Sequence, residues 1–319
     1  MESFDYTILK DFCAVRNLGN ANKNGIEYTP RMVFIMNFLD THNIPYHIDA
    51  FDKEYGGLHF FDSEKYLLDL SVEELEEKLS EADKNIKELQ RKIVTDGMLY
   101  NRHDFHEDFV IHTSIFILLE KAIVYKKFSE RGVDTKYFNI VVPGTSETMF
   151  LAHHDVSNPN IDNCNDNSAS IINLLALKLL KPDTSIVFTD CEEIGGYGAK
   201  RLSEQLKNGE HGNIKWVLNL ELTAVGGTNF IIGKKRNSLY EYMVENFVFT
   251  PFDDTYCVSD STILTRNGIQ SCVVTTLPLK NGKSDFDIIK YCHGSQDTIE
   301  LANYQDMQNF VEMVLTKMV

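Results

Sequence analysis

The spacing of apolar residues changes along the chain and predicts different structures in different stretches. Near the beginning, an apolar run at residues 31–39 predicts a helix, and the alternating segment 45–51 predicts a strand. From residue 137 onward, strand-like runs alternate with helical patterns, with strands at 138–142, 148–152, 185–189 and 216–220 and helices at 168–180 and 197–207. This alternation predicts an α/β fold, a three-layer α/β/α sandwich around a mostly parallel, mixed sheet.

The middle of the chain has a different pattern. Apolar residues from Val72 to Ile93 recur at steps of three and four residues, and Ser71 with Glu74 has the spacing of a helix capping box. A second helical pattern at 105–128 is long enough to fold back on the first. We therefore expect residues 1–319 to form one α/β domain, with a core of 1–61 and 132–319 and a helical insertion at 62–131. An apolar seam needs a partner helix, so the insertion is expected to pack on the body, to act as a lid or to mediate oligomerisation.

Composition narrows the classes of function. The 319 residues include 31 Lys and Arg against 47 Asp and Glu, which gives a formal charge of −16, and 43% of them are hydrophobic. Such a chain can bury a full core, but it repels phosphate backbones and anionic lipids, so neither nucleic acid nor membrane is expected as a partner. The acidic start and the lack of an apolar run of about 18–20 residues favour a cytoplasmic protein. Six cysteines without a CxxC pair predict buried, reduced thiols.

Polar side chains follow the predicted strands, where the function of a parallel sheet is usually located. His153 and Asp155 come at the end of the strand at 148–152, on the same face, and a carboxylate beside an imidazole is typical of a metal-binding histidine. Asp166 lies in a polar segment before the next helix, and Glu192 and Glu193 follow the strand at 185–189. Adjacent carboxylates repel each other unless a cation neutralises them.

Two further candidates complete the pattern. Glu221 ends the strand at 216–220, and His293 lies in a late loop. Imidazoles and carboxylates without cysteines in a ligand-like spacing suit a divalent metal, with zinc first and manganese or cobalt possible. The acids are too numerous for one tetrahedral ion, so the pattern predicts two ions.

The motifs together resemble those of the M28-type zinc aminopeptidases and of the related M20 and M42 metallopeptidases. The resemblance covers residues 137–319 and is carried by, in order, His153-x-Asp155, Asp166-Asn167-x-x-Ser170, Glu192-Glu193-x-Gly195-x-x-Gly198-Ala199, Asn219-Leu220-Glu221, Ser259-Asp260-Ser261 and His293-x-x-x-Asp297-Thr298. The sequence departs from the M28 pattern at Glu221, where Asp is usual, at Ser170, which replaces a common Gly, and at Ser261, which replaces a His.

The resemblance also implies roles for the candidate residues. It implies that His153, Asp166 and Glu221 hold one zinc ion and that Asp166, Glu193 and His293 hold the other, with Asp166 as the bridge. Glu192 is then the general base, and Asp155 is the carboxylate behind His153. The resemblance further implies a cis peptide bond between Asp166 and Asn167.

The function implied is that of a metal-dependent exopeptidase that releases N-terminal amino acids from peptides. Three alternatives stay open. One is an amidohydrolase or carboxypeptidase of the same scaffold acting on another small amide, because no residue that would bind the free end of the substrate is identified. The second is a single-zinc acyltransferase similar to glutaminyl cyclases. The third is a non-catalytic binding or structural protein that keeps the fold, which should have lost ligands or the base, whereas all six expected positions hold a competent residue. The expected partners are a peptide or small amide substrate and, through the helical arm, a second copy of the chain.

Overall fold

The structure is a computed structural model. It describes residues 4–15, 21–51, 65–96, 115–116, 118–119, 122–123, 137–157, 159–193, 195–233, 237–252, 259–284 and 292–319. The contacts within the chain divide it into two compact units, of which the first is formed by Met1–Tyr55 and Tyr137–Val319 and the second by Gly56–Lys136.

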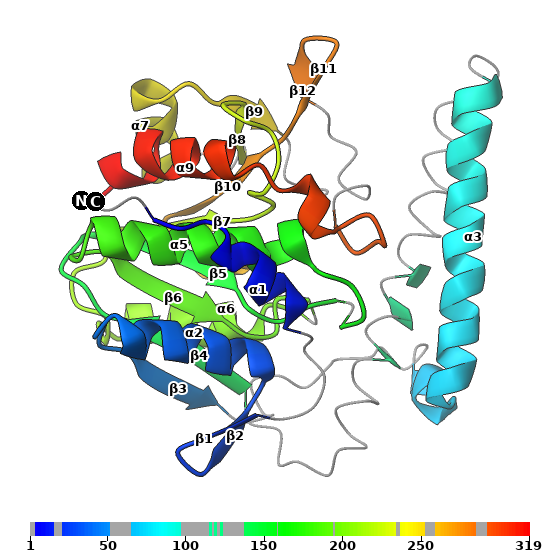
Figure 1. The fold of residues 1–319 in the computed structure, drawn as a ribbon, viewed down its shortest axis with the longest axis horizontal. Helices are drawn as coiled ribbons and strands as arrows, with labels where there is room; N and C mark the ends of the chain where they lie inside the picture. Colours follow the sequence, from blue (N-terminus) through cyan, green and yellow to red (C-terminus); the bar gives the residue numbers. More distant parts are fainter. Residues whose placement is uncertain are drawn as a thin grey trace. The chain divides into compact units, whose positions relative to one another are not determined.

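An eight-stranded mixed sheet forms the centre of the first unit (Figure 1). Its strands are β3 (His47–Phe51), β4 (Tyr137–Val142), β5 (Thr148–His153), β6 (Ser185–Thr189), β7 (Trp216–Leu220), β8 (Phe230–Gly233), β9 (Thr250–Phe252) and β10 (Ser271–Thr276). The strand order is β3-β4-β6-β5-β7-β10-β8-β9. The central strands β6, β5, β7 and β10 are parallel to one another, and β8 is parallel to β9. The remaining pairs, β3–β4, β4–β6 and β8–β10, are antiparallel. Two small hairpins, β1 (Ala21–Lys23) with β2 (Ile26–Tyr28) and β11 (Leu279–Lys280) with β12 (Lys283–Ser284), lie outside this sheet.

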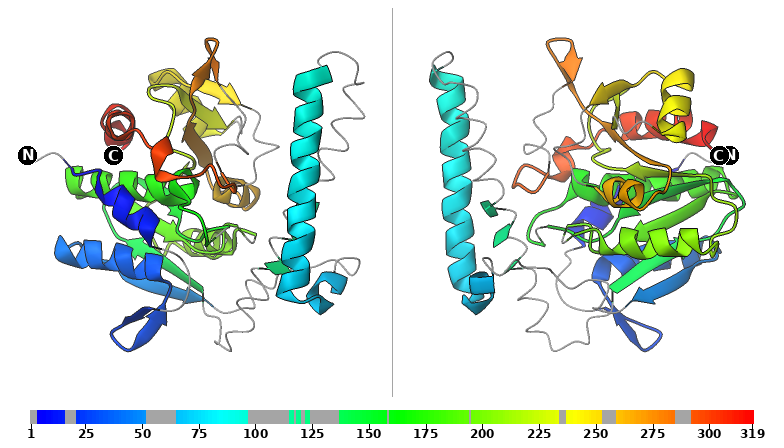
Figure 2. Two further views of the ribbon diagram at one scale, coloured as in Figure 1. Left: turned by 45° about the vertical axis from the view of Figure 1, so that its right-hand side comes forward. Right: turned by 180° about the vertical axis from the view of Figure 1, so that it is seen from behind.

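Helices cover both faces of the sheet. They are α1 (Ile8–Ala14), α2 (Pro30–Thr41), α5 (Ala169–Leu180), α6 (Tyr197–Lys207), α7 (Ser238–Asn246), α8 (Asp260–Arg266) and α9 (Tyr304–Met313), with short turns η2 (Cys164–Ser168), η5 (Ile299–Leu301) and η6 (Leu315–Lys317). Buried residues of α1, α2, α5, α7 and α9 form one apolar core with the sheet, and those of α6 and α8 form a second core on the other side (Figure 2).

Alternation along the strands produces these two cores. In β5, Phe150 and Ala152 belong to the larger core, whereas Met149 and Leu151 belong to the smaller one. Side chains of a strand point to opposite faces in turn, so a strand that is buried on both sides is apolar throughout. The α/β fold of three layers that the sequence predicts is therefore confirmed.

The second unit contains the helix α3 (Val72–Asp96), which follows the short turn η1 (Lys65–Asp69). The backbone N–H of Ser71 donates to Glu74 Oε2 at 2.7 Å, and the N–H of Glu74 donates to Ser71 Oγ at 3.1 Å, so the predicted capping box is present. Leu75 and Ala82 of the seam are buried in a separate apolar cluster that also contains Leu119 and Ile123. Where described, the predicted helix at 105–128 is helical.

The predicted elements up to Leu220 lie within a few residues of those observed. The strands at 185–189 and 216–220 and the helix at 197–207 have the predicted bounds. The helix predicted at 168–180 begins one residue later, at Ala169, after the kinked segment Cys164–Ser168, in which Asp166 and Asn167 have non-helical backbone angles. The five cysteines that the structure describes are buried and form no disulfide, whereas Cys257 lies outside the described residues. Among the described helices, none is both long and apolar enough to span a bilayer.

Candidate metal centre

The carboxyl ends of the central parallel strands bring the predicted site residues together. His153 is the last residue of β5, Glu192 and Glu193 follow β6, and Glu221 follows β7 directly. Parallel neighbours end at the same edge of a sheet, which places these side chains beside one another. Asp166 reaches the same edge from η2, and His293 reaches it from the loop before η5.

Asp166 lies at the centre of this cluster. Its Oδ1 is 3.1 Å from Nε2 of His153, and its Oδ2 is 3.0 Å from Nε2 of His293. The backbone around it is not helical, and the peptide bond from Asp166 to Asn167 is cis, as the resemblance to M28 enzymes implies. One carboxylate therefore joins two imidazoles that are 140 residues apart in the sequence.

The two adjacent glutamates have different surroundings. Glu193 Oε2 is 3.0 Å from Nε2 of His293, while its buried Oε1 has no hydrogen-bond partner among the described residues. Asp155 orders the backbone of both glutamates, because its Oδ1 and Oδ2 accept the N–H groups of Glu192 and Glu193, each at 3.1 Å. Asp155 Oδ1 also lies 3.3 Å from His153 Nδ1. The carboxylate that the sequence places behind His153 thus also fixes the neighbouring loop.

The turn after the glutamates requires glycine. The N–H of Gly198 donates to the carbonyl of Asp190 at 2.9 Å, and a Cβ at this position would lie 2.5 Å from the same oxygen. The close approach allows α6 to begin directly after the loop, so that Glu192 and Glu193 stay at the end of β6.

Glu221 contacts both His153 and two amides. Its Oε2 is 3.4 Å from His153 Nε2, and the same oxygen accepts a hydrogen bond of 2.6 Å from Asn167 Nδ2. Oε1 accepts a hydrogen bond of 3.1 Å from Asn219 Nδ2. These bonds fix the orientation of the carboxylate.

Burial and charge shift the ionisation of the acids in the cluster. Burial raises the pKa of Glu192 well above its ordinary value, and the charges of Glu221 and Glu193 add to this effect. Burial also raises the pKa of Glu193 and of Glu221, against the nearby histidines. Asp260 Oδ2 accepts a hydrogen bond of 2.5 Å from Thr189 Oγ1, and burial raises the pKa of Asp260 to about 7.

The ion pairs between Asp166 and the two histidines shift the pKa values of these residues in the direction that favours their charged forms. Burial opposes the charge on Asp166, but hydrogen bonds to His153 and His293 outweigh it and hold the pKa of Asp166 well below its usual range. Burial lowers the pKa of each histidine, but the carboxylates, Glu221 at His153 and Glu193 at His293, raise it well above its usual value. The cluster therefore attracts positive charge.

These residues fit a divalent cation. Two donors on one tetrahedral zinc ion lie about 3.3 Å apart, since each is about 2.0–2.1 Å from the metal. The distances of 3.0–3.4 Å that join His153, Asp166, Glu193, Glu221 and His293 are close to this value. The acids outnumber the imidazoles, and the unpaired buried Oε1 of Glu193 leaves one donor atom available. The donor set of imidazole and carboxylate groups suits zinc.

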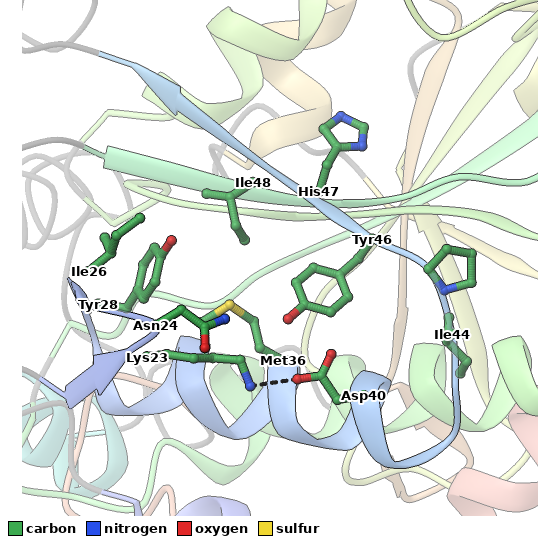
Figure 3. A pocket seen from close by; sticks show the side chains of 11 residues that line it. Lys23, Asn24, Ile26, Tyr28, Met36, Asp40, Ile44, Tyr46, His47 and Ile48 are labelled. Atoms are coloured by element: carbon green, nitrogen blue, oxygen red, sulfur yellow. Dashed lines mark hydrogen bonds and ion pairs between the residues drawn. The ribbon is translucent and has the colours of Figure 1, made fainter.

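A separate pocket of about 470 Å³ lies elsewhere in the first unit (Figure 3). It is lined by residues of β1, β2, α2 and the start of β3, including Lys23, Asp40 and Tyr46, and Lys23 Nζ is 2.7 Å from Asp40 Oδ2. Because β3 is an outer strand of the sheet, this pocket lies away from the central strand ends, and none of its lining residues is a predicted site residue.

Sequence reasoning gave no role to several residues that support the cluster. Asp297 is fully buried, and its two oxygens accept the N–H groups of Asn165 at 2.6 Å and Asp166 at 3.1 Å. The buried Arg31 donates to the carbonyl of His154 and to Ser168 Oγ, each at 3.0 Å. For Arg31, the sequence offers one indication, namely that it is the single charged residue of the predicted apolar helix at 31–39. Asp297 contacts residues that lie more than 130 positions earlier in the chain, and these contacts exist only because the fold brings the two loops together. The local sequence around Asp297 does not indicate them.

Comparisons with solved structures describe the fold. A zinc aminopeptidase from Bacillus subtilis, BSAP, is 17% identical, with a TM-score of 0.46 over 57% of this chain and 49% of that chain. The LapA aminopeptidase of Legionella pneumophila is 14% identical, with a TM-score of 0.46 over 76% of this chain and 73% of that chain. A glutaminyl cyclase of Porphyromonas gingivalis is 12% identical, with a TM-score of 0.56 over 98% of this chain and 95% of that chain. The match to BSAP thus spans about half of that protein's length, and no curated protein sequence matches the chain.

The family of the protein is assigned from its sequence. The model of peptidase family M28 matches residues 140–318, which is more than half of the chain and includes β5, β6, β7 and every residue of the candidate metal centre. The protein therefore belongs to peptidase family M28.

Proposed function

We propose that the protein is a metal-dependent exopeptidase that releases N-terminal amino acids from peptides. The observation that carries this proposal is the position of Asp166, whose two carboxylate oxygens each face a different histidine, at 3.1 Å and 3.0 Å. A carboxylate with this geometry suits a bridge between two cations. Membership of a peptidase family supports hydrolysis of a peptide bond as the reaction.

The described contacts support two groups of proposed ligands. His153, Asp166 and Glu221 would hold one zinc ion, and Asp166, Glu193 and His293 would hold the other. Cobalt or manganese would bind the same nitrogen and oxygen donors. Bound zinc supplies Lewis acidity, which lowers the pKa of water towards about 7 and polarises the substrate carbonyl.

Glu192 is the proposed general base. Its carboxylate takes a proton from the attacking water and returns it to the amine that leaves. Its neighbour Glu193 pairs with His293, whereas Glu192 has no such ion pair among the described residues. Asp155 accepts the N–H of Glu192 and so holds this residue in position at the end of β6. Burial raises the pKa of Glu192, which brings a carboxyl group closer to the range in which it exchanges protons near neutral pH.

The charge of the loaded site includes the proposed ions. The described ion pairs join four carboxylates, of Asp155, Asp166, Glu193 and Glu221, to two histidines, and two divalent cations would balance these four charges. The choice between the amino end and the carboxyl end of a substrate therefore depends on residues outside these ion pairs, and the substrate assay described below tests it.

One observation favours a second candidate, a single-zinc acyltransferase that cyclises N-terminal glutamine. Both oxygens of Glu221 already accept hydrogen bonds, from Asn167 and Asn219, which reduces their capacity to bind a cation beside His153. In this case only the position formed by Asp166, Glu193 and His293 would hold zinc.

Metal content and substrate choice test the proposal together. The purified protein would be stripped with a chelator, reloaded with zinc, cobalt or manganese, and assayed on aminoacyl anilides, N-acetylated peptides and a peptide with N-terminal glutamine. If the protein is an exopeptidase, we expect it to bind two metal equivalents per chain and to hydrolyse only the substrates that have a free amine. One metal equivalent with release of ammonia from the glutamine peptide would favour the cyclase. A protein that binds no metal would contradict both functions.

A further inference from the structure

A thiol lies beside the proposed metal centre. Cys292 immediately precedes His293, and its Sγ, a carboxylate oxygen of Asp166 and a ring nitrogen of His293 all lie within 4.8 Å of one another. Cys292 is 9% exposed and Asp166 is 6% exposed, so both donors lie in the interior of the protein. The sequence pattern gave no indication of this proximity, because Cys292 has no cysteine or histidine partner at a ligand-like spacing.

The backbone explains how two consecutive side chains reach the same acid. His293 has a φ of +56°, in the left-handed region that residues other than glycine rarely adopt. Neighbouring side chains in an extended segment point in opposite directions, and the left-handed turn removes this alternation. A rare conformation kept at such a position is typical of functional sites.

A second observation concerns Glu193, the other residue that pairs with His293. The side chain of Glu193 is 5% exposed, its Oε2 lies 3.0 Å from His293 Nε2, and its Oε1 has no hydrogen-bond partner among the described residues. A buried carboxylate oxygen without a donor is costly unless a cation is bound near it.

We propose that Cys292 is a fourth protein ligand of the metal held by Asp166, Glu193 and His293. This inference rests on the proposed function, because it takes these three residues as ligands. A sulfur and a nitrogen on one tetrahedral zinc ion lie about 3.5 Å apart, so donors that lie within 4.8 Å of one another need to approach by at most about 1.3 Å. When the bond between sulfur and metal forms, the thiol loses its proton to solvent, and no electron is transferred.

This ligand has two consequences. A site with three protein ligands keeps its fourth position open for water, whereas a fourth protein ligand closes it. Cys292 therefore holds the centre in a closed resting state, and the substrate or water has to displace the thiolate. Thiolate is also a softer donor than carboxylate, so the site gains preference for cadmium and zinc over manganese.

Cobalt spectroscopy tests the assignment without relying on activity. The full-length protein would be stripped of metal and titrated with Co²⁺ while the near-ultraviolet absorption of the thiolate-to-cobalt charge transfer is recorded. Cys272→Ser is the matched control, because Cys272 is also buried but lies in β10, where its Sγ contacts Asn237 Oδ1 at 3.5 Å. The band is expected in the wild type and in Cys272→Ser and is expected to be absent in Cys292→Ser. The ratio of Cd²⁺ to Mn²⁺ affinity should fall about tenfold or more in Cys292→Ser only.

A measurement on the wild-type chain covers the case in which Cys292→Ser does not fold. Zinc should protect Cys292 from iodoacetamide, as measured by mass spectrometry of its peptide, and a chelator should remove the protection. A wild type that binds cobalt without the band, or alkylation of Cys292 that zinc does not change, overturns the role of Cys292 and leaves the proposed function standing. A wild type that binds no cobalt overturns both.

Discussion

Phe51 and Tyr137 face each other across the antiparallel strands β3 and β4, although residues 52–136 separate them in the sequence. Their rings lie 5.8 Å apart. The chain therefore leaves the sheet and returns to it at neighbouring positions, and the second unit, Gly56–Lys136, lies within the connection of a single strand pair. A short turn is the usual connection of two such strands.

The first prediction follows from this pairing. Replacing residues 52–136 with a two-residue Asn-Gly turn should leave a folded first unit, because the site residues and both sheet cores lie outside the replaced segment. Circular dichroism should record a cooperative thermal transition, and the metal content after reloading should equal that of the full chain. An insoluble product or one without a transition would mean that the core depends on the second unit.

The same variant tests the role of the arm as a lid or as an oligomerisation element, which stays a prediction. The seam of α3 is buried against the helical segment that contains Leu119 and Ile123, so one partner of the seam lies within the chain itself. The mass from light scattering, divided by the mass of one chain, gives the number of chains per particle, and this number should be lower for the variant if the arm joins two chains. Rates on dipeptides and longer peptides should change their ratio if the arm restricts access. An unchanged number of chains per particle and an unchanged ratio would leave the arm with neither role.

The sequence predicted the central strands β5, β6 and β7 well because they are apolar on both faces and are bounded by helices of clear period. It also located the ligand candidates, since each lies at a strand end or in a recognisable motif. It did not place β8, β9 and β10, of which β8 and β9 have four and three residues and little periodic signal.

The supporting contacts of the site were harder to predict. Asp297 accepts the backbone N–H groups of Asn165 and Asp166, and Asn167 donates to Glu221 across 54 positions of sequence. Such contacts arise only when the sheet brings distant loops together. The motifs include both Asn167 and Asp297, but neither residue type nor local spacing indicates which distant group each of them contacts.

The adjacent acids Glu192 and Glu193 should respond differently to the same substitution. Glu192→Gln should retain metal and lose activity by about 10²–10⁴, because it removes a general base and leaves the ligand pairs intact. Glu193→Gln should lose metal, because it weakens the carboxylate that pairs with His293 at 3.0 Å. Metal analysis beside single-turnover rates checks both variants. Loss of metal in Glu192→Gln, with retention in Glu193→Gln, would reverse the two roles.

Asp155→Asn should weaken metal binding by about 10- to 100-fold although Asp155 is not a proposed ligand. Both carboxylate oxygens of Asp155 accept backbone N–H groups, from Glu192 and Glu193. An asparagine accepts only one of these bonds and presents an N–H group to the other. Competition with a chromogenic chelator measures the affinity, and the substitution Asp11→Asn on the exposed side of α1 controls for the change of charge. Equal affinities in wild type and Asp155→Asn would show that these bonds do not position the ligands.

Asp260 gives the chelated protein a pH-dependent stability of known sign. Burial raises its pKa to about 7 in the folded state, whereas an unfolded aspartate has a pKa of about 3.9. Between these values the folded state holds a proton that the unfolded state has lost. The contribution of Asp260 to stability is therefore fully present below about pH 4 and is lost as the pH rises through about 7.

Asp260→Asn should remove this part of the pH dependence, because asparagine does not titrate. The free energy of unfolding of the chelated wild type should fall between pH 5 and pH 7, and the slope for the variant should be less steep by up to about 1.4 kcal/mol per pH unit. Urea unfolding at several pH values in the presence of a chelator measures both slopes, and the exposed substitution Asp11→Asn should reproduce the wild-type slope. Glu192 and Glu221 also have raised pKa values, so a falling stability should persist in the variant with a smaller slope. Parallel curves for wild type and Asp260→Asn would mean that Asp260 is already ionised in the folded protein at pH 5.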